Sequence, residues 1–245
     1  MCQRCEEKRG FHGRNSGARQ GLSRRGLLAG AIGGAISMPS LELDGGALFA
    51  TAQAQTALSP DKALEDLVAG NARFAANQLT SLAADLDILK QHTLDKQEPF
   101  AAVLACADSR VPVELIFDQT IGHLFVTRVA GNICTPEIIA SLEYGAAVLG
   151  VAVIVVLGHD GCGAVKAAIE AKDVPGQISA LYAPLRPAVQ RAGSDLVKAI
   201  EANAAIQAEL LRTASPVIAG LAKQAKLKVV PARYELASGK VTFLA

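Results

Sequence analysis

Two short clusters of cysteine, histidine and aspartate are the residues in this sequence best suited to chemistry. The first contains Cys106 and Asp108, and the second contains His159 and Cys162. Two thiolates and one imidazole form a donor set that zinc favours in proteins. Asp108 would close a tetrahedral site if one of its oxygens bound the metal, whereas its absence would leave the fourth position to water. The first arrangement is a closed site and the second a catalytic one, and the residue types leave both open.

Each of these residues also has an ordinary structural explanation when it is taken alone. A single cysteine at a strand end is usually a small buried side chain, and a single histidine is usually a satisfied polar residue. The stretch from Asp108 to Arg110 would then be a surface turn with an ion pair. The metal hypothesis therefore requires that the two clusters lie together, which depends on the elements before them.

Short apolar runs precede both clusters and are typical of buried parallel strands. Residues 100–105 lead into the first cluster and residues 151–157 into the second, while residues 124–129 are a third candidate strand. Ligands bind beyond the carboxyl ends of the strands in sheets of this kind. We therefore expect the two clusters to converge at one edge of a sheet.

Helical patterns alternate with these strands, and several begin with a capping residue followed by proline, as in Ser59-Pro60 and Thr135-Pro136. The pattern predicts an α/β domain over residues 55–245, with a mostly parallel central sheet flanked by helices and a C-terminal hairpin. The helices are expected at 60–77, 137–149, 163–172, 194–212 and 216–225, and the hairpin strands at 229–236 and 240–244.

The overall composition is that of a globular chain, with 51% hydrophobic and 19% charged residues. A formal net charge of +1 gives no electrostatic reason to expect a nucleic-acid partner. The five cysteines are odd in number and scattered, which disfavours a disulfide scaffold and favours metal or catalytic use.

The first 54 residues have a different character and resemble a twin-arginine (Tat) export signal. Arg24 and Arg25 are followed by a mildly apolar run of about 13 residues, too short for a membrane span of about 20. Small residues around Ala52 and Ala54 fit a signal-peptidase site. We expect a cleaved precursor that engages the twin-arginine machinery, has no stable membrane insertion and is periplasmic or otherwise exported. The alternative is an uncleaved tail with accidental arginines.

A set of motifs, in the order expected for the family, resembles the β-class carbonic anhydrases over nearly all of the predicted domain. The motifs are CADSRVP at 106–112, DQ at 118–119, RVAGN at 128–132 and GHDGCG at 158–163, with NARF at 71–74, SLEY at 141–144, YEL at 234–236 and GKV at 239–241.

This resemblance implies a carbonate dehydratase, a zinc lyase that converts carbon dioxide reversibly to bicarbonate and a proton by attack of zinc-bound hydroxide. One Zn²⁺ per chain would be held by Cys106, His159 and Cys162. Asp108 and Arg110 would form a catalytic dyad in which the guanidinium holds the carboxylate off the metal. In a closed form of the site, Asp108 itself would bind the zinc.

The resemblance also implies substrate-binding roles for Gln97, Phe125, Tyr144 and Gly163. Some of these residues would come from a neighbouring subunit, because relatives are homodimers or homotetramers that share the active-site cleft. His123 is a weaker candidate for proton transfer to the surface. Asp160 stands where many relatives carry serine, and it adds a carboxylate next to the ligands.

Two other functions compete with carbon dioxide hydration. A carbon disulfide or carbonyl sulfide hydrolase of the same family would keep the zinc and change the access route. A structural zinc domain would keep Asp108 as a permanent fourth ligand. The Asp108 and Arg110 pair argues against the structural site, because a permanent ligand needs no cation to hold it away.

Overall fold

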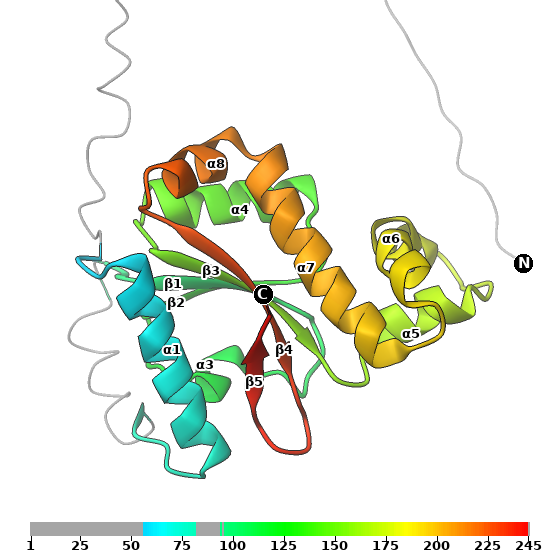
Figure 1. The fold of residues 1–245 in the computed structure, drawn as a ribbon, viewed down its shortest axis with the longest axis horizontal. Coiled ribbons are helices and arrows are strands. Elements are labelled where there is room, and N and C mark those ends of the chain that lie inside the picture. The colour runs from blue at the N-terminus through cyan, green and yellow to red at the C-terminus, as the bar shows by residue number, and fades with distance from the viewer. Residues whose placement is uncertain (1–55, 82–93, 95, 245) are drawn as a thin grey trace, which may run out of the picture. The chain divides into compact units, whose positions relative to one another are not determined.

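The computed structural model describes residues 56–81, 94 and 96–244, all within one compact unit, Gly45–Ala245. The predicted export signal and its cleavage region lie outside the described residues. The sheet has five strands in the order β2-β1-β3-β4-β5 (Figure 1). The strands are β1 (Ala101–Ala105), β2 (Leu124–Arg128), β3 (Val153–His159), β4 (Lys228–Tyr234) and β5 (Val241–Phe243).

The sheet is parallel except at one edge. Strands β2, β1, β3 and β4 all pair in parallel, and β5 turns back antiparallel on β4. This arrangement confirms the predicted fold class, a mostly parallel sheet with a C-terminal hairpin. In the register of β1 and β3, Ala105 lies beside Leu157, so the residues that follow both strands meet at one edge.

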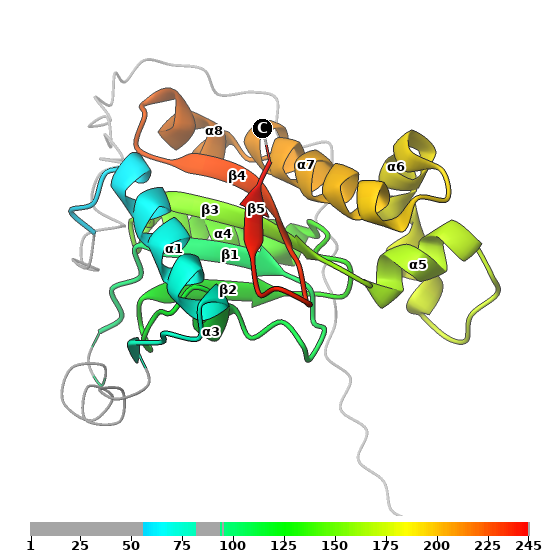
Figure 2. The ribbon, with the colours of Figure 1, turned by 60° about the horizontal axis from the view of Figure 1, so that its bottom comes forward.

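Helices cover both faces of the sheet, as its continuous apolar strands require. Alternate residues of β1 face opposite sides: Val103 packs with α1 and α3, whereas Leu104 packs with α4, α7 and α8. Figure 2 shows α1 lying across the first of these faces. The helices are α1 (Pro60–Ala75), α3 (Val113–Ile116), α4 (Pro136–Ala147), α5 (Gly163–Glu170), α6 (Tyr182–Ala192), α7 (Leu196–Ala214) and α8 (Pro216–Lys223), with a 3₁₀ turn at Ile178–Leu181. Within the described part of the chain, no helix is both long and apolar enough to cross a bilayer.

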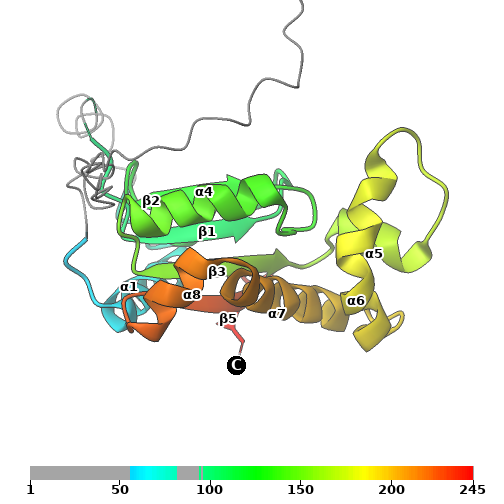
Figure 3. The same cartoon turned by 90° about the horizontal axis from the view of Figure 1, so that it is seen from above.

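Helices α5 and α6 lie beyond the carboxyl ends of the strands, as Figure 3 shows. They enclose a separate apolar cluster that joins Ile133, Val165, Leu185 and Ile200 to two cysteines of the predicted site. This cluster buries both cysteines at the carboxyl edge of the sheet.

The predicted elements agree with the observed ones apart from their ends and three short helical segments. The sequence analysis left out α3, the 3₁₀ turn and α6. Helix α6 contains Pro184 in its first turn, where proline is tolerated, and Pro187 in its interior, where proline is normally disfavoured. Its buried Leu185 and Ala188 show that packing offsets the hydrogen bond that Pro187 cannot donate.

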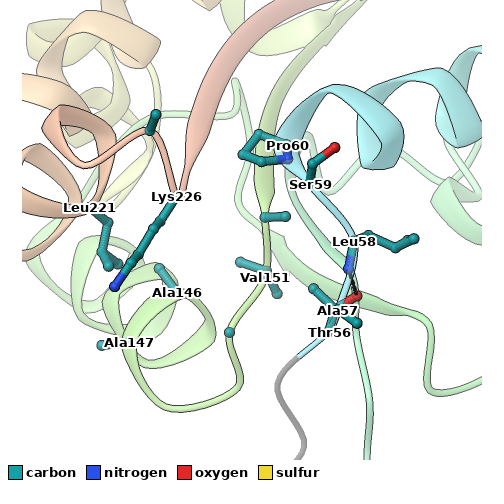
Figure 4. Close-up of a pocket in the computed structure, with 13 residues that line it drawn as sticks. Thr56, Ala57, Leu58, Ser59, Pro60, Ala146, Ala147, Val151, Leu221 and Lys226 are labelled. Atoms are coloured by element: carbon teal, nitrogen blue, oxygen red, sulfur yellow. Dashed lines mark hydrogen bonds between the residues drawn. The ribbon is translucent and has the colours of Figure 1, made fainter.

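The amino edge of the sheet contains a hollow of about 440 Å³ (Figure 4). It lies between the segment before α1, the end of α4 and the end of α8, and its lining includes Ala146, Leu221 and Lys226. His123 lies at this amino edge too, because it directly precedes β2. The sheet separates it from the clusters at the carboxyl edge of its own chain, and its expected role in proton transfer stays a prediction.

Candidate metal centre

Cys106, His159 and Cys162 converge at the carboxyl edge of the sheet. Cys106 follows β1, His159 is the last residue of β3, and Cys162 is the N-cap of α5. Their ligand atoms all lie within 4.8 Å of one another, and the two Sγ atoms are 3.9 Å apart. All three residues are buried, and within residues 56–81, 94 and 96–244 they are the one such group suited to a metal ion.

The imidazole of His159 is oriented as a metal ligand requires. Its Nδ1 lies 2.9 Å from the carbonyl oxygen of Asp160, to which it donates a hydrogen bond. Its Nε2 is buried and has no hydrogen-bond partner. A buried nitrogen without a partner is costly, and a metal ion would satisfy it. The donor set and this unpartnered atom fit zinc.

The hydrogen bond between the Cys106 and Cys162 side chains shifts the pKa values of the two thiols in opposite directions. The Cys106 and Cys162 Sγ atoms share a hydrogen bond, and Cys106 Sγ accepts another, at 3.3 Å, from the Gly131 N–H. These hydrogen bonds, the one with Cys162 above all, lower the pKa of Cys106, although burial opposes the shift. The pKa of Cys162 is raised because its thiol bonds to Cys106 and is itself buried. A divalent cation would favour ionisation of both thiols.

Asp108 is held by Arg110 in a bidentate pair beside the three donors. Arg110 donates from Nε to Oδ1 at 2.9 Å and from Nη2 to Oδ2 at 2.8 Å, and its backbone N–H adds a bond to Oδ1. The guanidinium of Arg110 holds the pKa of Asp108 well below its usual range. Asp108 Oδ2 lies 3.8 Å from His159 Nε2, so the carboxylate borders the position that a metal would occupy.

Two residues that the sequence analysis did not assign hold the backbone of the site. Arg128 donates to the carbonyl oxygen of Cys106 at 3.0 Å and to that of Asp108 at 2.6 Å. Asn203, buried on α7, donates at 2.8 Å to the carbonyl oxygen of Gly131. The RVAGN motif could have indicated a role for Arg128. For Asn203, the only indication in the sequence is that it is a polar residue in an alanine-rich helix.

The two glycines that flank Cys162 differ in backbone conformation and in surroundings. Gly161 adopts φ +64°, a left-handed conformation in which glycine avoids strain. Gly163 opens α5 and is exposed, and a Cβ placed there would meet no atom within 4 Å. Gly163 therefore borders open space next to the ligand Cys162.

Gln97, Phe125 and Tyr144 are not brought to the metal centre of their own chain. Gln97 is exposed and precedes β1, at the opposite end of that strand from Cys106. Phe125 is level with Ala102 in the sheet, four residues before Cys106, a separation of about 13 Å along the strand. Tyr144 pairs with Phe125 at 6.2 Å between ring centroids, and its side chain is 47% exposed.

Comparison with known proteins agrees with this fold and donor set. Residues 101–241 match the family model for carbonic anhydrase. A carbonic anhydrase of Mycolicibacterium smegmatis is 39% identical over 190 residues, which cover 74% of this chain and 89% of that protein.

Two solved structures also resemble this one. A tetrameric β-carbonic anhydrase of Sordaria macrospora has a TM-score of 0.62 at 22% identity, with 74% of this chain and 96% of that chain covered. A β-carbonic anhydrase of Aspergillus fumigatus has a TM-score of 0.59 at 25% identity, with 74% and 90% covered.

The fold and site thus define an α/β protein with a Cys₂His metal-type centre at the carboxyl edge of a parallel sheet. The chain belongs to the carbonic anhydrase family, and its fold is that of the β class. The predicted enzyme class, carbonate dehydratase, is confirmed.

Proposed function

We propose that this protein is a zinc-dependent carbonic anhydrase that hydrates carbon dioxide reversibly to bicarbonate and a proton. The observation that carries the proposal is the buried, unpartnered Nε2 of His159, which lies among two thiol groups and beside a fixed carboxylate. When bound, zinc is a Lewis acid that makes water a nucleophile near neutral pH. Membership of the carbonic anhydrase family supports carbon dioxide as the substrate.

Cys106, His159 and Cys162 hold the zinc ion in this proposal, with one ion per chain. The hydrogen bond from His159 Nδ1 to Asp160 fixes the tautomer in which Nε2 is free to bind metal. Asp108 accepts a hydrogen bond from the reacting water and so orients it. Arg110 keeps both carboxylate oxygens engaged, which supports an open site in which Asp108 is not a ligand.

The substrate pocket is completed by a neighbouring subunit in this proposal. Gln97, Phe125 and Tyr144 lie away from the triad of their own chain, and the exposed ring of Tyr144 is free to line the pocket of another copy. The backbone N–H of Gly163, next to Cys162, would bind a substrate oxygen. The protein would then be a homodimer or homotetramer. Light scattering after size-exclusion chromatography distinguishes these states from a monomer, which would contradict the shared pocket.

The activity is tested by stopped-flow hydration of carbon dioxide with the zinc-loaded protein from about pH 6.5 to 9, after zinc has been counted per chain. Fast hydration already near pH 7 is expected for the open site. A steep rise with pH would instead favour a closed form in which Asp108 binds zinc at low pH. No hydration at any pH, with one zinc per chain, would overturn the proposed reaction.

We also propose that residues 1–54 are a twin-arginine export signal that delivers the folded enzyme to the periplasm. The support is the Arg24-Arg25 pair, the short apolar run after it and the small residues near Ala54. Fractionation of cells that express the full chain should find the processed protein outside the cytoplasm. An Arg24→Lys/Arg25→Lys variant should stay inside unprocessed, and its normal export would contradict the proposal.

A further inference from the structure

Asp160, the residue directly after the ligand His159, is held by two successive residues of β4. The backbone N–H of Asp160 donates to the carbonyl oxygen of Tyr234 at 3.0 Å. Arg233 Nη1 donates to Asp160 Oδ1 at 2.6 Å. The carbonyl oxygen of Asp160 in turn accepts the hydrogen bond from His159 Nδ1. The support of the imidazole therefore continues through Asp160 to β4.

Arg233 is itself fixed from the opposite side. Its Nε lies 3.0 Å from Glu201 Oε1 on α7, so the guanidinium is placed between carboxylates from two different elements. The Arg233 side chain is only 19% exposed, and Asp160 and Glu201 are half-buried. Ion pairs so placed are screened less by solvent than pairs on the open surface. The three residues form a charge-paired unit that connects β4 and α7 to the end of β3, in which Arg233 and Glu201 are joined by charge without hydrogen-bond geometry.

We propose that Arg233 is a positioning residue for His159 and acts through Asp160, with Glu201 holding the guanidinium in place. The outer hydrogen bond of a ligating imidazole sets its tautomer and ring orientation, so a fixed Asp160 carbonyl fixes the direction of Nε2. This inference rests on the proposed function, because the metal it concerns is zinc.

The test measures zinc affinity by competition with a chelator, and it measures the ¹⁵N shifts of the His159 ring in the zinc-loaded full chain. Arg233→Ala is expected to weaken zinc binding by about 10- to 100-fold, the usual effect of losing an outer partner of a ligand. Asp160→Ala should weaken it similarly, and the double variant should lose no more than the larger single loss. Arg233→Lys, which keeps one donor, should recover part of the affinity.

Lys228→Ala is the matched control. Lys228 lies on the same strand and also forms an ion pair, with Asp61, but at the amino edge of the sheet. This variant should bind zinc as the wild type does, and its His159 ring shifts should be unchanged. A general loosening of β4 would instead weaken zinc binding in both variants, and equal losses would overturn the inference.

The outcomes separate the inference from the proposed function. If the wild-type chain binds no zinc, the proposed function fails before any variant is compared. If the wild type binds zinc and Asp160→Ala or Arg233→Ala binds it equally well with unchanged ring shifts, only the positioning role is overturned. Asp160 is partly exposed, so its variant keeps the test decisive even if Arg233→Ala does not fold.

Discussion

The loop after β1 and the turn after α3 each contain an aspartate paired with an arginine, yet the two pairs are built differently. Within the described part of the chain, Asp108 takes all its side-chain hydrogen bonds from Arg110, two residues away, and its side chain is 18% exposed. Asp118 is completely buried and accepts from three residues, Arg73 Nε at 2.5 Å together with groups of Thr80 and Ser81.

This difference shows which pair is structural. Burial opposes ionisation of Asp118, but hydrogen bonds from Arg73, Thr80 and Ser81 outweigh it and lower its pKa. Arg110 lowers the pKa of Asp108 as well, so the direction of the shift does not separate the roles. The hydrogen-bond partners separate the two roles. Asp118 connects the last turn of α1 to the turn after α3, whereas Asp108 is held by its own loop and lies beside the metal ligands.

Removal of a zinc ligand should have the largest effect, which is a loss of bound zinc and of hydration activity. Cys106→Ser is nearly isosteric but replaces a thiolate donor, so zinc should be lost and hydration should fall by more than about 10³-fold. Zinc content and stopped-flow hydration measure this. Cys134→Ser is the matched control, because burial raises the pKa of Cys134 to about 12 and this thiol is outside the triad. Full activity of Cys106→Ser would refute the ligand assignment.

Replacement of Arg110 should strongly reduce turnover and leave the fold intact. Arg110→Ala frees both oxygens of Asp108 to bind the zinc, so hydration should fall by about 10²-fold or more while zinc stays bound. Because the side chain of Arg110 is half-exposed, the midpoint of thermal unfolding should change little. Kinetics, zinc content and thermal unfolding are measured on one preparation. Normal activity in this variant would remove the dyad from the mechanism.

The sequence predicted the three metal donors and the parallel sheet because both are encoded locally. The buried strands are continuous apolar runs, and each donor lies at or just after a strand end. Asn203 and Arg233 could not be predicted, because they contact residues 72 and 73 positions away and depend on how α7 packs and how β4 is registered. Helix α6 was missed because its prolines contradict local propensity, which tertiary packing overrides.

Replacement of Arg73, the partner of the buried Asp118, should lower stability and leave turnover unchanged, the opposite of Arg110→Ala. Arg73→Ala leaves Asp118 buried with fewer donors, which should lower the free energy of unfolding by about 2 kcal/mol, less than for a fully buried pair because Arg73 is partly exposed. The midpoint of thermal unfolding should fall by about 4–8 °C. Urea unfolding and hydration by the folded fraction are the measurements. A loss of turnover with unchanged stability would reverse the assignment of the two pairs.

The smallest expected effect is a pH dependence of stability that belongs to Asp118. Its pKa is lower in the folded protein than in the unfolded chain, where it is about 3.9. The carboxylate therefore stabilises the fold above that value, and this contribution is lost as pH falls through the folded pKa. The difference in unfolding free energy between wild type and Asp118→Asn should be constant near pH 6 and shrink below about pH 4.

Urea unfolding of the metal-free proteins measures this difference, because zinc ligands would add their own pH dependence. Asp173→Asn, at an exposed position, is the control and should match the wild type throughout. A difference for Asp118→Asn that stays constant down to pH 3 would show that its contribution does not depend on charge. The tie between α1 and the turn would then rest on hydrogen bonds that an amide also accepts, and the contrast with Asp108 would be one of position alone.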